Sequence, residues 1–341
     1  MTFLNRRSVI KGGLTAAAAV GMGPLLSVDG FSEGKPVVNL QLGWLLSGNQ
    51  LGEVCAKALG YYEQEGLELK IQAGGPNIDG VAVVASGRYE VGQVSSSPSL
   101  MLAASQDIPV VCFGTGAQEH PYAFFSLPRK PIRKPADMAG KKIGIQATGV
   151  ILLKALLAKN NVPEKDVEIV PIGADMAPLL TGQVDAVTGW LTNTTALKVL
   201  GPDRIDLRLW DAGVKLYALP YYATRDTIAK KGDMLAKFMR ATGKGWAFAY
   251  ENRDKAVDYL TKEFTNLVWK DERESIDDMM KFAFSPKTKV EGWGTMDPAV
   301  WQDQINTYAM LGQFSKRTPK LDEVMTLEIL KASADARPKI G

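Results

Sequence analysis

Short apolar segments that favour β-strands alternate with longer helical segments from Pro36 onward. This alternation is typical of βα units, in which parallel strands form a sheet and helices cover its faces. The predicted strands are 37–42, 67–72, 89–94, 110–113, 142–146, 167–171, 186–189 and 207–210. The sequence therefore predicts an α/β fold.

Two extended apolar segments, 122–127 and 219–224, divide the βα pattern into two sets. They flank about a hundred residues, a normal size for a domain. The whole chain of 341 residues is longer than one hydrophobic core usually serves. We therefore predict two Rossmann-like lobes joined by hinge strands near 122–127 and 219–224. Lobe 1 is expected to combine 36–122 with 225–341, and lobe 2 to span 127–219.

The chain after residue 226 is almost wholly helical in pattern. The predicted helices are 234–252, 253–264, 271–284, 298–311 and 323–334. We expect this tail to return to the first lobe and cover it.

The first 33 residues have the pattern of an export signal. A basic start that includes Arg6 and Arg7 precedes an Ala-rich apolar stretch, 14–26, which is too short for a permanent membrane span. The run 5–11 resembles a twin-arginine signal, which sends folded proteins across the bacterial inner membrane. A basic helix belonging to the fold is the alternative, which Gly12 and Gly13 disfavour. We expect a periplasmic protein, soluble or tethered by an uncleaved signal.

The charge balance and the scarcity of His and Cys exclude several classes of function. With 40 Lys and Arg against 37 Asp and Glu, the formal net charge is only +3, too small for a protein whose task is to bind nucleic acid. A single His120 cannot build a multi-histidine metal site, and no cofactor is predicted. Cys55 and Cys112 allow either one disulfide or two buried thiols, and their apolar surroundings favour the thiols.

No catalytic motif stands out. The chain has no G-x-S-x-G elbow, Walker loop, dinucleotide fingerprint or H-E-x-x-H helix. His120 could act as a base oriented by Glu119, but adjacent side chains rarely point at each other, so a packing role in the loop is favoured. We predict that the protein is not an enzyme.

The ends of the predicted strands carry small and hydroxyl residues in both lobes. Open α/β sheets place ligands at the carboxyl ends of their strands, where backbone N–H groups and hydroxyls can bind them. Ordinary helix capping explains any one of these loops, but their recurrence favours a binding site. The candidate ligand-binding residues are Trp44, Asn49, Gly74, Gly75, Ser96, Ser97, Thr115, Thr148, Gly149, Asp175, Trp190, Asn193 and Tyr221.

The aromatic and charged residues near these loops favour a neutral or weakly basic heterocycle. Trp44 and Trp190 follow strands of different lobes, so they could hold a planar ligand between them. Tyr221 could join them, although buried packing is the competing interpretation. The loops contain no Lys or Arg, which an anion would ordinarily require. Asp175 could accept a ligand N–H or cap the following helix through the Ala177 N–H.

Three segments carry a family resemblance: GYYEQEGLEL (60–69), KPADMAGKKIG (134–144) and LTGQVDAVTGW (180–190). With them the chain resembles ABC-transporter substrate-binding proteins of the group that binds sulfonates, nitrate, taurine and thiamine-pyrimidine precursors. The resemblance implies a type II periplasmic-binding-protein fold that closes around a solute. It also implies that a monomer presents the solute to a membrane permease and its ATPase.

We therefore expect the solute-binding component of an ABC importer, with a pyrimidine-like or other nitrogen heterocycle as its ligand. An alkanesulfonate, taurine or nitrate-type anion is the alternative ligand. An enzyme of pyrimidine-precursor synthesis on the same fold is the alternative class, but such enzymes have a centre rich in His and Cys. A binding module of a sensor protein, with a fused signalling segment, is the third.

Overall fold

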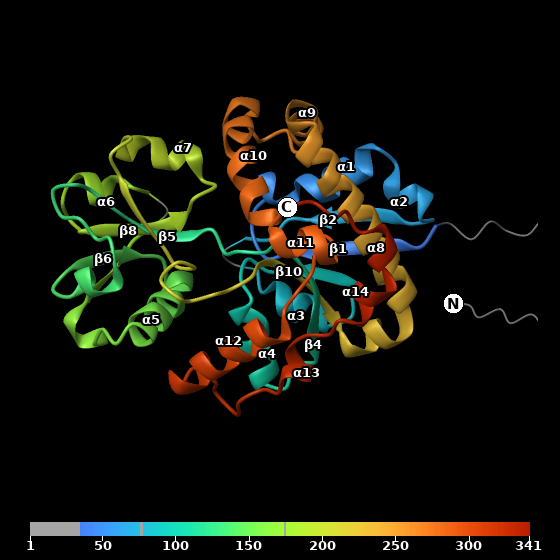
Figure 1. Cartoon of the computed structure of the whole chain (residues 1–341). Coiled ribbons are helices and arrows are strands. Elements are labelled where there is room, and N and C mark those ends of the chain that lie inside the picture. The colour runs from blue at the N-terminus through green and yellow to red at the C-terminus, as the bar shows by residue number, and fades with distance from the viewer. Residues whose placement is uncertain (1–34, 76–77, 174) are drawn as a thin grey trace, which may run out of the picture. The chain divides into compact units, whose positions relative to one another are not determined.

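The strands of the described chain form two five-stranded sheets, each with its own helices (Figure 1). The structure is a computed structural model that describes residues 35–75, 78–173 and 175–341. The predicted export signal, residues 1–33, lies outside the described residues. The predicted α/β fold with two lobes is confirmed. Both lobes belong to one unit, Lys35–Gly341.

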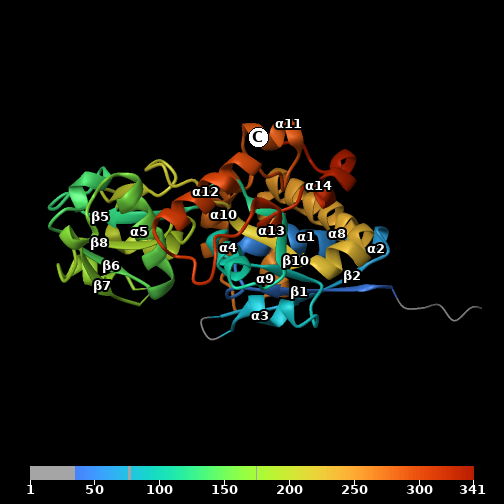
Figure 2. The ribbon, with the colours of Figure 1, turned by 90° about the horizontal axis from the view of Figure 1, so that it is seen from below.

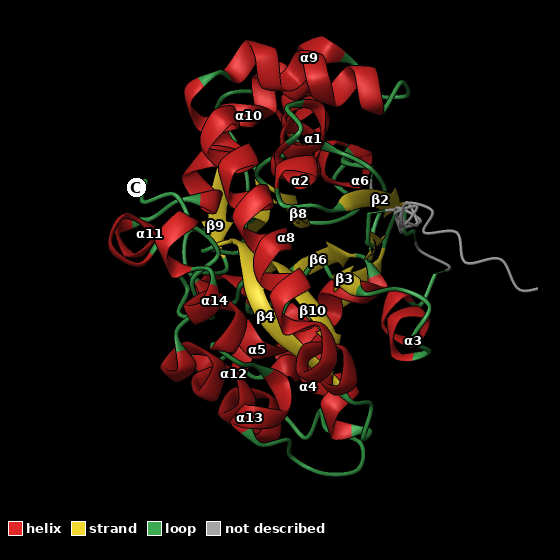
Figure 3. Cartoon of the chain, turned by 90° about the vertical axis from the view of Figure 1, so that its right-hand side faces the viewer, coloured by secondary structure: helices red, strands yellow, loops and turns green. Residues whose placement is uncertain are grey.

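The first sheet has the strand order β2-β1-β3-β10-β4. Its strands are β1 (Val37–Leu42), β2 (Glu68–Gln72), β3 (Val91–Gln93), β4 (Val110–Ala117) and β10 (Ala218–Thr224). The strand β1 runs parallel to β2 and β3, whereas β10 is antiparallel to both β3 and β4. Figure 3 shows β4 and β10 side by side, and both strands are buried along their whole length. These two strands therefore form the centre of the first lobe.

The second sheet has the strand order β7-β6-β8-β5-β9. Its strands are β5 (Tyr122–Ser126), β6 (Lys142–Ile145), β7 (Glu168–Pro171), β8 (Ala186–Trp190) and β9 (Ile205–Arg208). The strand β6 runs parallel to β7 and β8, whereas β5 is antiparallel to β8 and β9. Each sheet thus combines parallel strands with an antiparallel strand that lies next to a crossing of the chain between lobes.

The first lobe contains η1 (Gly48–Gln50), α1 (Leu51–Ala58), α2 (Tyr61–Gln64), α3 (Gly80–Ala85) and α4 (Pro98–Ser105). The second contains η2 (Pro135–Met138), η3 (Ala147–Gly149), α5 (Val150–Lys159), η4 (Glu164–Asp166), α6 (Ala177–Leu180), α7 (Thr194–Leu197) and η5 (Lys198–Leu200). The C-terminal part contains α8 (Arg225–Glu251), α9 (Arg253–Glu263), α10 (Trp269–Ala283), α11 (Pro286–Glu291), α12 (Pro298–Met310), α13 (Leu321–Val324), α14 (Glu328–Ala332) and η6 (Ala334–Ala336).

The helical tail packs on the first lobe, as its pattern predicts. Helix α8 begins at the Thr224 cap, whose side chain accepts from Thr227 N–H at 3.0 Å, and packs against α1. Figure 2 shows these two helices next to each other. They approach closely because two glycines meet there: a Cβ at Gly245 would lie 1.9 Å from the Gly52 carbonyl oxygen. The glycines therefore fix the position of α1. The N-terminus of this helix directly follows the segment that carries the candidate residues Trp44 and Asn49.

The two segments predicted to be hinge strands lie inside the sheets instead. Segment 122–127 is almost entirely β5, and 219–224 belongs to β10. The chain crosses between the sheets earlier, in 118–121 and 209–217. Apolar extended sequence suits a central strand covered on both faces as well as a buried link, and strand partners are set by residues far away in the chain. The sequence pattern could not separate these two cases.

The segment Gly114-Thr115-Gly116 is also a strand rather than the predicted loop. It lies within β4, where a Cβ at Gly114 would be 2.7 Å from Met239 Cε. A Cβ at Gly116 would be 2.9 Å from Leu219 Cβ. The glycines here give neighbouring side chains room, which a sequence pattern does not distinguish from a turn.

Both cysteines are free thiols buried in the first lobe, so the disulfide alternative is not present. Among the described helices, none combines the length and the apolar composition needed to cross a bilayer.

Candidate functional site

An aromatic cluster lies at the carboxyl edge of the second sheet. Trp190 ends β8 and pairs in the sheet with Tyr122, the first residue of β5. The His120 ring meets the Trp190 ring edge-on at a centroid distance of 5.2 Å and the Tyr122 ring at 6.1 Å. Gly149, at the end of η3 after β6, packs on the same cluster, since a Cβ there would be 2.1 Å from Tyr122 Oη. Trp190 is half-buried, so part of its indole faces outward.

His120 is a buried, neutral member of this cluster. Only 1% of the residue is exposed, and burial lowers its pKa to about 3. Its Nδ1 accepts the Tyr122 N–H at 3.2 Å, so the ring proton is on Nε2, for which the described residues offer no partner. The structure matches the packing role that the sequence favours for His120.

The first loop, 43–50, forms the corresponding edge of the first sheet. Trp44 follows β1 and is 42% exposed. The Ser47 side chain caps η1 by accepting from Asn49 N–H at 3.3 Å, which leaves Asn49 half-buried beside it. Gly74 N–H donates to the Trp44 carbonyl at 2.9 Å, and a Cβ at Gly74 would lie 2.2 Å from the Leu42 carbonyl oxygen. Gly74 therefore lets the turn after β2 lie directly against the first loop.

Gly75, Ser96 and Ser97 differ in the space around them and in their hydrogen-bond partners. Gly75 is buried, but among the described residues a Cβ there would meet only Leu45 Cδ2, at 3.8 Å. Ser97 is fully buried, and its hydroxyl donates to Gln304 Oε1 at 2.6 Å. The Ser96 hydroxyl has no partner among the described residues. This hydroxyl oxygen is itself buried, so Ser96 differs from Ser97 in lacking a partner and not in being open to solvent.

Thr115 and Tyr221 lie in the interior of the first lobe. Both are fully buried. The Thr115 hydroxyl donates to the Ala218 carbonyl at 2.7 Å, and Tyr221 Oη donates to Glu53 Oε1 at 2.6 Å. Because both hydroxyls are already bonded inside the lobe, we leave these two residues out of the proposed ligand contacts.

Three candidates of the second lobe are exposed: Thr148, Asp175 and Asn193. Thr148 lies in η3 after β6, and Asn193 follows Trp190 in the turn before α7. Asp175 Oδ1 accepts from Ala177 N–H at 2.9 Å, which is the helix-capping alternative. Thr148 and Asn193 are thus exposed at this edge, while Asp175 already holds the start of α6.

The structure adds Glu272, on α10, to the first loop. A Cβ at Gly48 would lie 2.7 Å from Glu272 Oε2, so the carboxylate contacts the backbone of the loop. Burial raises the pKa of Glu272, the neighbouring Asp271 adds to this, and a hydrogen bond from the Gly48 backbone partly offsets it. More than two hundred residues separate Glu272 from the loop, so no local sequence signal could have placed it there.

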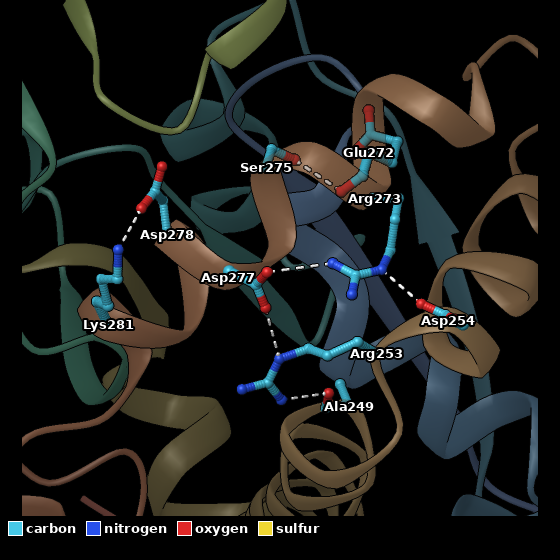
Figure 4. A network of polar contacts seen from close by, with 9 residues as sticks. All are labelled: Ala249, Arg253, Asp254, Glu272, Arg273, Ser275, Asp277, Asp278 and Lys281. Atoms are coloured by element: carbon cyan, nitrogen blue, oxygen red, sulfur yellow. Dashed lines mark hydrogen bonds and ion pairs between the residues drawn. The ribbon is translucent and has the colours of Figure 1, made fainter.

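A network of ion pairs fixes α10 beside α9 (Figure 4). Arg273 Nε lies 2.5 Å from Asp254 Oδ1, and its Nη1 lies 3.1 Å from Asp277 Oδ2. Arg253 Nε lies 3.1 Å from Asp277 Oδ1. Isolated pairs of this kind stabilise little, but a shared network restrains the helices more. Glu272 projects from the same turn of α10 as Arg273 (Figure 4).

Helix α10 contacts both lobes. Glu272 lies against Gly48 of the first loop, as described above. Glu274 forms an ion pair with Lys198 of η5, which follows β8 and α7 in the second lobe. Helix α10 therefore contacts the first loop of one lobe and the α7–η5 segment of the other. Among the described residues, no three His, Cys, Asp or Glu side chains are grouped as metal ligands would be.

The chain forms two five-stranded sheets with their own helices and passes between them twice. This arrangement defines a protein of the periplasmic-binding-protein fold. One solved structure of this fold is the periplasmic aliphatic sulphonate binding protein SsuA from Escherichia coli. It matches with a TM-score of 0.66 and 16% identity, over 84% of this chain and 91% of that one. The chain itself belongs to the NMT1/THI5-like family, whose model matches residues 47–256.

Two curated relatives show the range of this family. A formylaminopyrimidine-binding protein of Halalkalibacterium halodurans is 27% identical over 257 residues, 72% of this chain and 77% of the relative. A 4-amino-5-hydroxymethyl-2-methylpyrimidine phosphate synthase of Schizosaccharomyces pombe is 28% identical over 204 residues, 54% of this chain and 58% of the enzyme. The relatives of this chain thus include both a binding protein and an enzyme.

Proposed function

We propose that the protein is the exported solute-binding component of an ABC importer and binds a neutral nitrogen heterocycle between its lobes. The contact of α10 with the first loop of one lobe and the α7–η5 segment of the other carries this proposal. Each edge presents a partly exposed tryptophan, Trp44 on the first and Trp190 on the second. Two indoles can hold a planar ring by stacking on both of its faces.

The charges around the first loop favour a ligand without negative charge. Loop 43–50 contains no Lys or Arg, and the Glu272 carboxylate contacts its backbone at Gly48. A sulfonate or nitrate bound to this loop would lie near a carboxylate, and the loop itself carries no basic side chain to offset the repulsion. A ring with N–H donors would be attracted instead. The formylaminopyrimidine-binding relative supports the same class of ligand.

The protonation and burial of the His and Cys residues support a protein that binds its ligand without catalysing a reaction. Burial raises the pKa of Cys55 to about 12 and that of Cys112 further, so neither thiol ionises near neutral pH. His120 is neutral and enclosed by aromatic rings. An enzymatic role, which the synthase relative keeps open as the rival, would need other groups to supply nucleophile and base.

The remaining parts of the proposal follow from the sequence and the family. A twin-arginine-type signal in residues 1–33 would bring the folded protein to the periplasm. There, as a monomer, it would present its solute to a permease coupled to an ATPase.

The test is to purify the protein from the periplasm under native conditions and identify any bound small molecule by mass spectrometry. Titration calorimetry then compares a formylaminopyrimidine with taurine and ethanesulfonate. We expect binding of the pyrimidine and not of the two sulfonates. Tight binding of a sulfonate would show that the ligand is an anion and not a nitrogen heterocycle. Conversion of the pyrimidine into a product would overturn the transport role.

A further inference from the structure

A buried polar cluster lies beneath the first loop. It consists of Gln50, Glu53, Gln93 and Tyr221, each 3% exposed or less. Polar groups buried to this degree are costly unless they are hydrogen-bonded. Three short elements, η1, α1 and β3, and the central strand β10 contribute the four side chains. The cluster therefore joins the core of the lobe to the start of α1.

The hydrogen bonds of the cluster form one chain that leads to the loop. Tyr221 Oη and Gln93 Nε2 both donate to Glu53 Oε1, at 2.6 and 3.0 Å. Gln93 Oε1 then accepts from Gln50 Nε2 at 3.0 Å. Gln50 Oε1 accepts from Ser47 N–H at 3.2 Å. The chain ends in the Ser47 turn, whose hydroxyl accepts from Asn49 N–H.

The direction of this chain is set at Glu53. Its Oε1 accepts two hydrogen bonds, so Gln93 must present its NH₂ group to Glu53 and its oxygen to Gln50. Gln50 must then present its NH₂ group to Gln93, which leaves its oxygen for Ser47 N–H. Reversing either amide would set two donors or two acceptors against each other. One buried acceptor thus fixes the orientation of two amides and the turn that they hold.

We propose that Glu53 is a positioning residue for the first loop: through Gln93 and Gln50 it holds the Ser47 turn, and thereby Asn49 and Trp44, in the geometry that binds the ligand. The effect on ligand binding rests on the proposed function. The link between Glu53 and the Ser47 turn does not. Glu272 contacts the same turn from α10, so the loop is held from the core and from the tail.

Glu53 is also the member of the cluster that changes charge near neutral pH. Burial raises its pKa to about 7, and the hydrogen bonds from Tyr221 and Gln93 partly offset this. The titratable groups that face it are Tyr221 on β10, Tyr62 on α2 and Cys55 on its own helix, and all three stay neutral because their pKa values are raised. An ionised Glu53 accepts stronger hydrogen bonds than a protonated one. The turn should therefore be held more firmly above pH 7 than below it.

The test breaks the chain at Gln93. Gln93→Leu separates Glu53 from Gln50 while the bond from Tyr221 to Glu53 stays. The matched control is Ser333→Ala, which removes a buried 2.8 Å hydrogen bond to the Ile329 carbonyl in the tail that packs on the same lobe, away from the loop and from Glu53. Amide hydrogen exchange at Ser47 reports on the turn without any ligand, and calorimetry with a formylaminopyrimidine reports on binding.

We expect Gln93→Leu to speed exchange at Ser47 about tenfold and to weaken pyrimidine binding by a similar factor, an effect of about 1.4 kcal/mol. Ser333→Ala should change neither. Glu53→Gln keeps an oxygen that can accept from Tyr221 and Gln93, so it should retain binding but lose the rise in affinity between pH 6 and 8. Unchanged Ser47 exchange in Gln93→Leu would overturn the link. If the wild-type protein binds no pyrimidine, the proposed ligand fails, and the exchange measurement still decides whether Glu53 positions the turn.

Discussion

Trp190, the last residue of β8, is the strand partner of Tyr122, the first residue of β5. This pairing joins the aromatic edge of the second lobe to the first crossing between the lobes, because Tyr122 follows directly after residues 118–121. A movement of one lobe relative to the other would therefore act on the residues that hold Trp190. The arrangement suits a protein in which ligand contact and lobe movement are coupled.

Trp190→Ala should weaken binding of a formylaminopyrimidine about tenfold or more, because it removes one stacking face and the apolar area around it. The fold should be retained, since Trp190 is only half-buried. The control is Trp269→Ala, a tryptophan of α10 that is 41% exposed and donates to Asp258. Calorimetry on both variants decides, and equal affinities would remove Trp190 from the site.

Gly74→Ala should destabilise the protein by about 2 kcal/mol, because its Cβ would overlap the backbone of Leu42 and Trp44. Gly75→Ala is the adjacent control, since the one described group that its Cβ would meet is a flexible Leu45 methyl group at 3.8 Å. Urea unfolding of the two variants measures the difference. Equal stability of Gly74→Ala and Gly75→Ala would contradict the close contact between the two loops.

Stability should depend on pH through Glu53. Its pKa is raised from 4.5 in the unfolded chain to about 7 in the folded one, so the folded state binds more protons in this window. The wild-type protein should therefore lose stability relative to Glu53→Gln as the pH rises from 4.5 to 7, by about 3 kcal/mol in total. His120 acts in the opposite direction, because its lowered pKa costs stability as the pH falls below 6.5, but both proteins carry it. Urea titrations at several pH values test this, and a constant difference would show that Glu53 does not titrate as described.

Neither cysteine should react with a thiol reagent in the native protein. Both are buried and free, and burial raises the pKa of each thiol. Two thiols should appear once the protein is unfolded in guanidinium. A thiol that reacts rapidly under native conditions would favour the enzymatic alternative, and fewer than two thiols after unfolding would indicate a disulfide.

The alternation of strands and helices was predictable because it depends on local periodicity. The predicted strand 37–42 coincides with β1, and the predicted helices 253–264, 271–284 and 298–311 match α9, α10 and α12 within two residues. The predicted helix 323–334 is instead divided into α13 and α14. The roles of 122–127 and 219–224 were not predictable, because a central strand and a buried link have the same composition. Thr115 was misplaced in a loop for a similar reason, since glycines mark both turns and close packing.

The candidate site was predictable in part. Trp44, Gly74, Gly149 and Trp190 could be placed at strand ends because strands of a parallel sheet end at one edge. Glu272 and the chain from Glu53 to Ser47 could not, because their contacts join residues that are distant in sequence. Whether a hydroxyl such as that of Tyr221 is free or already bonded also depends on such contacts.

A crystal structure of the complex with a formylaminopyrimidine tests the central claim most directly. The account predicts one unaltered pyrimidine ring in contact with both Trp44 and Trp190, with the lobes closed on it. A ligand held by one lobe alone, away from either indole, or a pyrimidine found chemically changed in the crystal would contradict it.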